Sequence, residues 1–199
     1  MRLHRDSTSK RATTGRGQTL VEFAIVFPLF WMVLVGLIEF AFAFSSVLTV
    51  SYASRNAALV AAEAGAAGTA DCAILWQIEK DVQAPSAAAQ IQTVDISWTD
   101  VNGKDKAGFV TTYTRNSSVS INCVLPGVTF AAPYQKTADG YPMSSRCSIL
   151  SGCAGHPTLD TVGVKVTYRY VYHTPYGAVL GGTGITLERA SAMRMEPFQ

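Results

Sequence analysis

A long apolar segment directly behind a basic start most restricts what this chain can fold into. It reads GRGQTLVEFAIVFPLFWMVLVGLIEFAFAF from Gly15 to Phe44, and between Phe23 and Phe44 its only ionisable side chain is Glu39. A helix needs about 20 apolar residues to cross a hydrocarbon core of about 30 Å. The segment therefore predicts one membrane-spanning helix.

The charges around this segment predict its orientation. The net charge of the whole chain is only +2, but the residues before Phe23 carry five cations against Asp6 and Glu22. Positive charge beside a spanning helix marks its cytoplasmic end. We therefore expect residues 1–17 in the cytoplasm and the polar bulk, from Ser45 onward, outside. The five cations are Arg2, Arg5, Lys10, Arg11 and Arg16.

Three other interpretations of the N-terminus are weaker. Ala41-Phe42-Ala43 resembles a signal-peptidase site, but the apolar run is longer than the hydrophobic region of a cleavable signal. An organelle transit peptide is also Arg- and Ser-rich, yet no amphipathic pattern follows this leader. A basic tail can bind nucleic acid, but here the cations are scattered without interleaved aromatic residues, so no nucleic-acid partner is predicted.

All four cysteines follow the apolar segment. An even number on the exported side predicts two disulfides. Three pairings are open, and the short loop between the last two cysteines makes these one candidate pair. A zinc site at Cys153-Ala-Gly-His156 lacks a second close pair of ligands, so a disulfide beside a surface histidine is favoured and no metal is predicted. The candidates are Cys72, Cys123, Cys147 and Cys153.

The helical pattern continues beyond the apolar segment. No glycine or proline occurs between Phe44 and Gly65, and apolar residues recur at helical spacing. One helix over residues 18–64, about 70 Å long, would span the membrane and protrude outside it. The alternative is a break at Ser45-Ser46 and a separate amphipathic helix. We expect three parts: a leader (1–17), this helix (18–64) and an extracytoplasmic domain (65–199).

The outer domain has the pattern of an α+β fold. A further helix is predicted over residues 70–83, ending before Pro85. Alternating apolar residues then predict a small antiparallel sheet, with a hairpin turning at Asn102-Gly103. The predicted strands cover 94–99, 109–113, 119–125, 162–172 and, with a bulge, 185–197. Residues 126–160 are expected to form a long loop.

No enzyme chemistry is predicted. The three histidines (His4, His156 and His173) lie in no nucleophile–base or metal motif, so a membrane-tethered hydrolase using His156 or His173 is the weakest hypothesis. The glycines at 181–184 lack the lysine and helix of a phosphate loop. The tyrosines at 168, 170 and 172 favour the core face of a strand over a binding surface. No cofactor is expected.

Glu22, at the start of the apolar segment, requires a reason because a carboxylate in hydrocarbon is costly. If the chain is cut after Gly17, Gln18 gains a free α-amine, and four residues separate it from Glu22 on one helix face. That amine can neutralise Glu22 in its own chain or in a neighbouring subunit. A buried ion pair of this kind would fix the register between subunits.

These residues carry a family resemblance. The basic leader, Gly17 and the hydrophobic helix resemble the processing region of type IV prepilins. The sequence is more closely similar to the TadE-like family of Flp (Tad) pilus assembly proteins, which share a G-Q-x-x-V-E-F-A start and a G-x-x-E-F step. Here these are Gly17–Ala24 and Gly36–Phe40.

The resemblance implies a function and several site residues. A prepilin peptidase would cut between Gly17 and Gln18, while Glu22 and Phe23 would serve cleavage, assembly or both. Glu39, about 25 Å from Glu22 along a helix, would lie near the outer membrane–water boundary, either protonated or reaching the headgroups, or would pair with a cation of another subunit.

The size of the outer domain favours a minor pilin or pseudopilin over the main filament subunit. Its implied partners are other pilin subunits, the peptidase, the Tad assembly machinery and membrane lipid. The implied location is the cytoplasmic membrane, with possible incorporation into a surface pilus. The alternative function is an uncleaved, signal-anchored binding module unrelated to pili.

Overall fold

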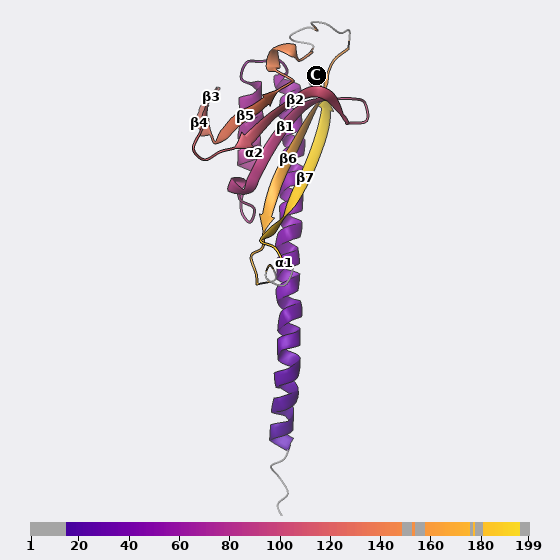
Figure 1. The fold of residues 1–199 in the computed structure, drawn as a ribbon, viewed down its shortest axis with the longest axis vertical. Coiled ribbons are helices and arrows are strands. Elements are labelled where there is room, and N and C mark those ends of the chain that lie inside the picture. Colours follow the sequence, from indigo (N-terminus) through magenta and orange to yellow (C-terminus); the bar gives the residue numbers. More distant parts are fainter. Residues whose placement is uncertain (1–14, 149–152, 154–157, 176, 178–180, 196–199) are drawn as a thin grey trace, which may run out of the picture.

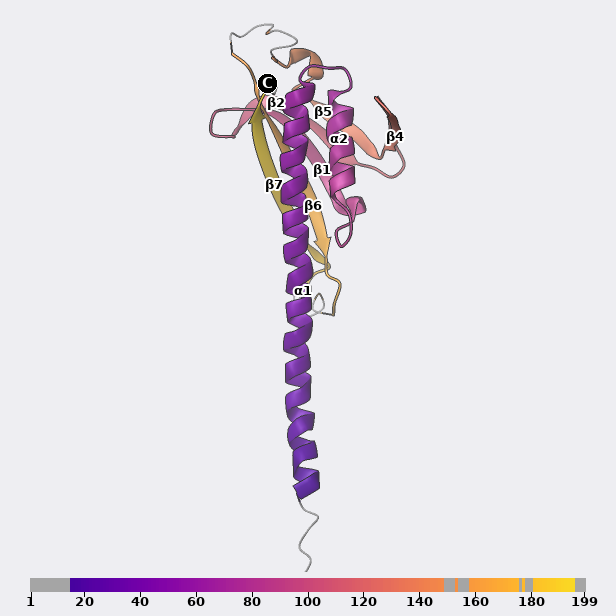
Figure 2. The same cartoon turned by 180° about the vertical axis from the view of Figure 1, so that it is seen from behind.

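The chain folds as a long helix with an α+β domain at one end (Figure 1). The computed structural model describes residues 15–148, 153, 158–175, 177 and 181–195. In both views the N-terminal half of the first helix projects away from the domain (Figure 2). The predicted fold class is confirmed.

Helix α1 (Gly15–Ala64) is continuous, so the prediction of one long helix is confirmed and the alternative break at Ser45-Ser46 is wrong. Both serines are accommodated inside the helix. The Ser45 carbonyl accepts a hydrogen bond from Thr49 Oγ1 at 2.9 Å, and the Ser46 hydroxyl accepts one from Ser86 at 3.1 Å. Gly65 follows the helix with a positive φ of 53°, a conformation that glycine adopts without strain at a helix C-terminus.

Five strands form the main sheet, in the order β5-β2-β1-β6-β7, and all adjacent pairs are antiparallel. The predicted hairpin is confirmed as β1 and β2, joined through Gly103 at φ 76°. Figure 2 shows α1 and α2 (Ala70–Asp81) on the same face of this sheet, with α1 against β6 and β7. The strands are β1 (Ile91–Thr99), β2 (Asp105–Arg115), β5 (Tyr134–Asp139), β6 (Thr161–Val171) and β7 (Gly184–Arg194).

The core lies between the helices and this sheet. On β6, alternate residues point toward the helices and are buried, as the predicted strand requires: Val162, Val164, Val166, Tyr168 and Tyr170. Small residues of α1, including Ala53 and Ala57, are fully buried against them. The tyrosine pattern is therefore mainly a core pattern, although Tyr172 lies beyond the end of β6 and is half-buried.

Two sequence predictions are wrong. Residues 126–160 are not one loop, because they contain β4 (Val128–Ala132) and β5 as well as a short 3-10 helix (Met143–Ser145). All of β5 except Tyr134 is exposed, so it lacks the alternation that reveals a half-buried strand. The predicted bulge in β7 is also wrong, since β7 pairs with β6 in unbroken register from Gly184 to Arg194.

Two disulfides join parts of the domain. Cys72 of α2 pairs with Cys123 of β3 (Ile121–Leu125), which forms a separate hairpin with β4. Cys147 pairs with Cys153, as the short loop between them suggested. The prediction of two disulfides is confirmed, and the first fastens the β3–β4 hairpin to the helical layer.

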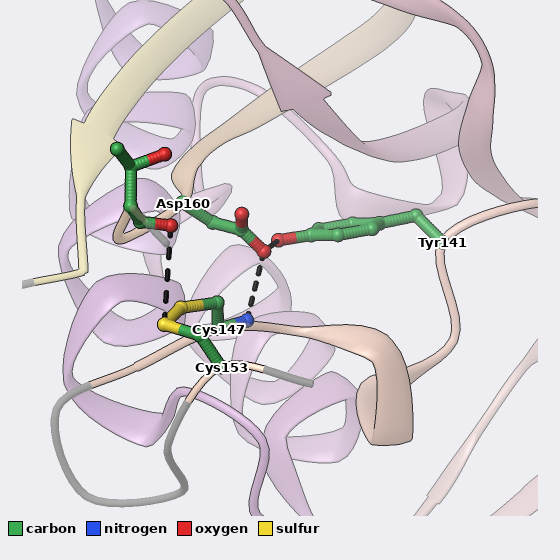
Figure 3. The surroundings of a disulfide bond; sticks show 5 residues. Tyr141, Cys147, Cys153 and Asp160 are labelled. Carbon is green, nitrogen blue, oxygen red and sulfur yellow. Dashed lines mark hydrogen bonds between the residues drawn. A yellow bond between two sulfur atoms is a disulfide. The ribbon is translucent and has the colours of Figure 1, made fainter. Parts of the chain in front are cut away.

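A buried polar cluster lies beside the second disulfide. Asp160 accepts hydrogen bonds from the Tyr141 hydroxyl at 2.5 Å and from the Cys147 amide at 2.8 Å (Figure 3). The Cys153 Sγ lies 3.9 Å from the Thr158 carbonyl oxygen. Arg146 forms an ion pair with Asp71 of α2 at 2.5 Å, and both side chains are almost fully buried. This cluster joins residues 141–148 and 158–160 to the body of the domain.

We expect the domain to lose stability as the pH rises above about 10. Burial raises the pKa of Tyr113, Tyr134 and Tyr141, and neighbouring carboxylates raise it further. The contribution is fully present below pH ~10, where unfolded tyrosine is still protonated. Above that pH the folded state binds more protons than the unfolded state, so the free energy of unfolding falls by about 1.4 kcal/mol per pH unit for each such tyrosine.

This expectation is checked by urea unfolding at a series of alkaline pH values, with tyrosinate absorbance followed in parallel. Replacing Tyr113 by Phe should make the decline shallower by the contribution of one tyrosine. A free energy of unfolding that stays constant to about pH 11 would contradict the assignment of raised pKa values.

Candidate functional site

The N-terminal half of α1 exposes apolar side chains on all sides. Leu20, Phe30 and Leu37 are 69%, 60% and 65% exposed, whereas Val50, beneath the domain, is fully buried. Among the described residues, this is the one helix that is long and apolar enough to cross a membrane. Its exposed surface is the kind that lipid or other apolar helices cover.

The predicted cleavage site lies in the first turn of α1, where helices fray most readily. A Cβ added to Gly17 would meet no described atom within 4 Å, so packing within the described chain does not require glycine there. Phe23 is 63% exposed, and its ring lies 5.3 Å from that of Phe27. These observations leave Gly17 and Phe23 available for a partner.

Gln18 and Glu22 share one face of α1. The Gln18 side-chain amide donates a hydrogen bond to Glu22 Oε1 at 3.2 Å. This contact gives the spacing that a free α-amine at Gln18 would need to approach the same carboxylate. The pairing of that amine with Glu22 stays a prediction.

Glu39 points into the domain, unlike its neighbours in α1. It is 6% exposed, whereas Phe40 is 68% exposed. The Tyr170 hydroxyl donates to its carboxylate, as do the backbone amides of His173 at 3.2 Å and Thr174 at 2.8 Å. The carboxylate is therefore satisfied by its own chain, an arrangement that the sequence analysis did not include. These partners lie more than 130 residues away, and no local pattern marks them.

The side chains around Glu39 form a compact polar and aromatic junction. Burial raises the pKa of Tyr170, and its hydrogen bond to Glu39 raises it further, so the Tyr170 hydroxyl stays protonated at neutral pH and donates this hydrogen bond. The His173 ring lies 5.1 Å from the Phe42 ring, and its Nδ1 lies 3.4 Å from the Tyr170 hydroxyl. These contacts are those of a structural junction between α1 and the end of β6. His4 and His156 lie outside the described residues.

Further polar contacts fix the position of the domain along α1. Ser86 donates to Ser46, and Asn56 donates to Asp81 of α2 at 2.8 Å. Displacement of the helix by one turn would break both contacts as well as those of Glu39. The domain is therefore held in one register along the helix.

A cavity of about 620 Å³ lies on the sheet face away from the helices. Gly163 lies at its floor, between Thr99 and Ser97, and Lys165 and Arg194 contribute cations. Lys165 forms an ion pair with Asp95 at 3.0 Å. The described residues that line it include no histidine or cysteine, and within the described chain no three His, Cys, Asp or Glu residues are arranged to hold a metal.

The comparisons with known proteins concern α1. Residues 17–59 match the family model described as TadE-like protein. The match confirms the family resemblance seen in the sequence, and it begins at the predicted cleavage glycine. The matched residues lie within α1, the helix that is long and apolar enough to cross a membrane. No curated protein and no solved structure matches the chain.

Proposed function

We propose that this TadE-like chain is a minor pilin or pseudopilin of a Tad pilus, with a structural role in pilus assembly or adhesion. Residues 1–17 are the cytoplasmic leader, residues 18–64 form the anchor and stalk, and residues 65–199 form the domain outside the cytoplasmic membrane. The TadE-like match and the apolar, exposed start of α1 support this division.

One observation supports a role among other subunits more than any other. Beyond Glu39, α1 continues an apolar stripe on the side turned away from the domain. The stripe consists of Phe40, Phe44, Leu48 and Tyr52, which are 68%, 54%, 42% and 62% exposed. Residues four apart form the ridges by which helices pack against each other. A simple membrane anchor would not need this stripe, whereas a helix packed among pilin helices would bury it.

The proline in the apolar half of α1 is also consistent with a helix packed among other helices. Pro28 lies inside the helix and has no amide proton, so the Ala24 carbonyl loses its usual helical donor. In a membrane such carbonyls are tolerated where a neighbouring helix or polar side chain satisfies them. Packing against another subunit would provide that environment.

We expect the mature protein to begin at Gln18. Mass spectrometry of the membrane-extracted protein, from cells with and without the prepilin peptidase, measures this directly. Replacing Glu22 by Ala should reduce incorporation into pili at least about tenfold, equivalent to about 1.4 kcal/mol, because the new α-amine loses its partner. Glu63→Ala is the matched control, since Glu63 is an exposed glutamate on the same helix.

The outcomes separate the two functions. An intact Met1 start in cells with active peptidase, together with normal function of Glu22→Ala, would favour the uncleaved binding module and exclude the pilin role. A start at Phe44 would instead indicate ordinary signal cleavage.

A further inference from the structure

We propose that the domain rests on the phospholipid headgroups at the outer membrane surface, and that the contact is made by the end of the domain beside Glu39. We call this end the tip and define it as the described residues 172–175 and 181–183, which lie in the connection between β6 and β7. Figures 1 and 2 both show the described ends of this connection, next to β6 and β7, on the side of the domain nearest the projecting half of α1. The inference rests on the proposed spanning role of α1.

The length of the part of α1 that lies outside the domain sets the depth of the tip relative to the membrane. Between Gln18 and Ile38, α1 has no contact with the domain deep enough to bury a side chain. Twenty residue steps of 1.5 Å give about 30 Å, the thickness of a hydrocarbon core. The next residue, Glu39, is the first buried residue of the helix and is held by the tip. The domain thus begins where the hydrocarbon would end.

The backbone of the tip prevents it from entering the hydrocarbon core of the membrane. Its described residues form turns and bends rather than a strand or helix, and such irregular segments do not enter lipid-exposed hydrocarbon because their polar groups need partners. The side chains of His173 and Pro175 are exposed, and Gly181 adopts a positive φ. A deeper position would force this backbone into hydrocarbon, and a shallower one would expose the apolar helix to water.

The tip also carries groups suited to headgroups. Tyr172 is half-buried beside Tyr170, with ring centres 5.9 Å apart, and tyrosine is enriched where membrane meets water. Arg169 is exposed and donates to the Thr183 hydroxyl at 2.7 Å, which places a cation beside the tip. A guanidinium can bind lipid phosphate.

The test uses the full-length protein in vesicles of phosphatidylcholine and phosphatidylglycerol. The photo-crosslinker p-benzoyl-phenylalanine replaces one residue at a time, and mass spectrometry quantifies lipid adducts. Position 173 probes the tip, and this replacement keeps the backbone amide that donates to Glu39. Position 101 is the matched control, because Val101 is 96% exposed in the β1–β2 turn, about one 11-residue strand length (about 33 Å) from the tip. Position 30 tests insertion of the helix itself.

We expect adducts at positions 30 and 173, with at least about tenfold more at position 173 than at position 101, given the interfacial depth of tip residues. Adducts at position 30 but equal, low yields at 173 and 101 would overturn the headgroup contact while leaving the anchor intact. Absence of adducts at position 30 would instead overturn the spanning role and, with it, this inference.

Discussion

Replacing Arg146 by Met is expected to destabilise the domain by about 3–5 kcal/mol. Arg146 is 2% exposed and forms an ion pair with Asp71, which is 4% exposed. Asp160, another buried carboxylate, lies in the same cluster (Figure 3). Removing the cation leaves buried negative charge without its compensating partner, and this costs more than the ion pair itself contributes. Since domains are commonly stable by only 5–15 kcal/mol, the loss is a large part of the total.

The measurement is urea unfolding of the detergent-solubilised protein with intact disulfides, followed by fluorescence of the domain. Arg189→Met is the matched control, because Arg189 is an exposed arginine on β7, and its replacement should change the free energy of unfolding by less than about 0.5 kcal/mol. The double variant Asp71→Asn with Arg146→Met should recover at least half of the loss. A loss for Arg146→Met no greater than that of Arg189→Met would contradict the role assigned to the ion pair.

Elements with strong periodic patterns could be predicted from the sequence. The apolar run and the absence of glycine and proline indicated α1, and five alternating core residues indicated β6. The sheet hairpin was marked by Asn102-Gly103. By contrast, β4 and β5 were missed because they lie in a stretch rich in glycine, proline and serine, which indicated a loop, and because β5 exposes nearly all of its residues to solvent. Burial creates the patterns that sequence analysis uses, so a polar edge strand gives little signal.

The functional residues also fall into two groups: those in a local motif, which the sequence shows, and those that only the tertiary structure brings together. Gly17, Gln18 and Glu22 form a local motif, and the helix alone brings Gln18 and Glu22 together. The partners of Glu39 depend on how the domain folds back along α1, as does the pairing of Cys72 with Cys123 across 51 residues. Contacts of this kind follow from the tertiary structure and have no marker in the neighbouring sequence.

Replacing Glu39 by Ala is expected to release the tip from α1 without unfolding the rest of the domain. The substitution removes the acceptor for the Tyr170 hydroxyl and for the amides of His173 and Thr174. Buried donors that lose their partner cost about 1–3 kcal/mol each, so the tip should open to reach water or headgroups. The core of β6, which includes Val164 and Val166, has no contact with Glu39 that this change would remove.

Hydrogen exchange of the vesicle-reconstituted protein measures the opening. The amides of His173 and Thr174 should exchange about 10–100 times faster, corresponding to about 1.4–2.7 kcal/mol of lost protection, while the amides of β6 exchange as before. The pKa of Tyr170 should fall toward its ordinary value, because the hydrogen bond to Glu39 raises it. Glu39→Gln should have a smaller effect, since its amide oxygen can still accept a hydrogen bond.

Glu63→Ala provides the comparison on the same helix, because Glu63 is exposed and its loss should leave exchange at the tip unchanged. If Glu39→Ala also leaves the His173 and Thr174 amides fully protected, the carboxylate does not hold the tip. If protection is instead lost throughout β6, Glu39 supports the whole domain rather than its junction with the membrane anchor. The localised result would mean that one acidic side chain in an apolar helix fixes where the anchor ends and the domain begins.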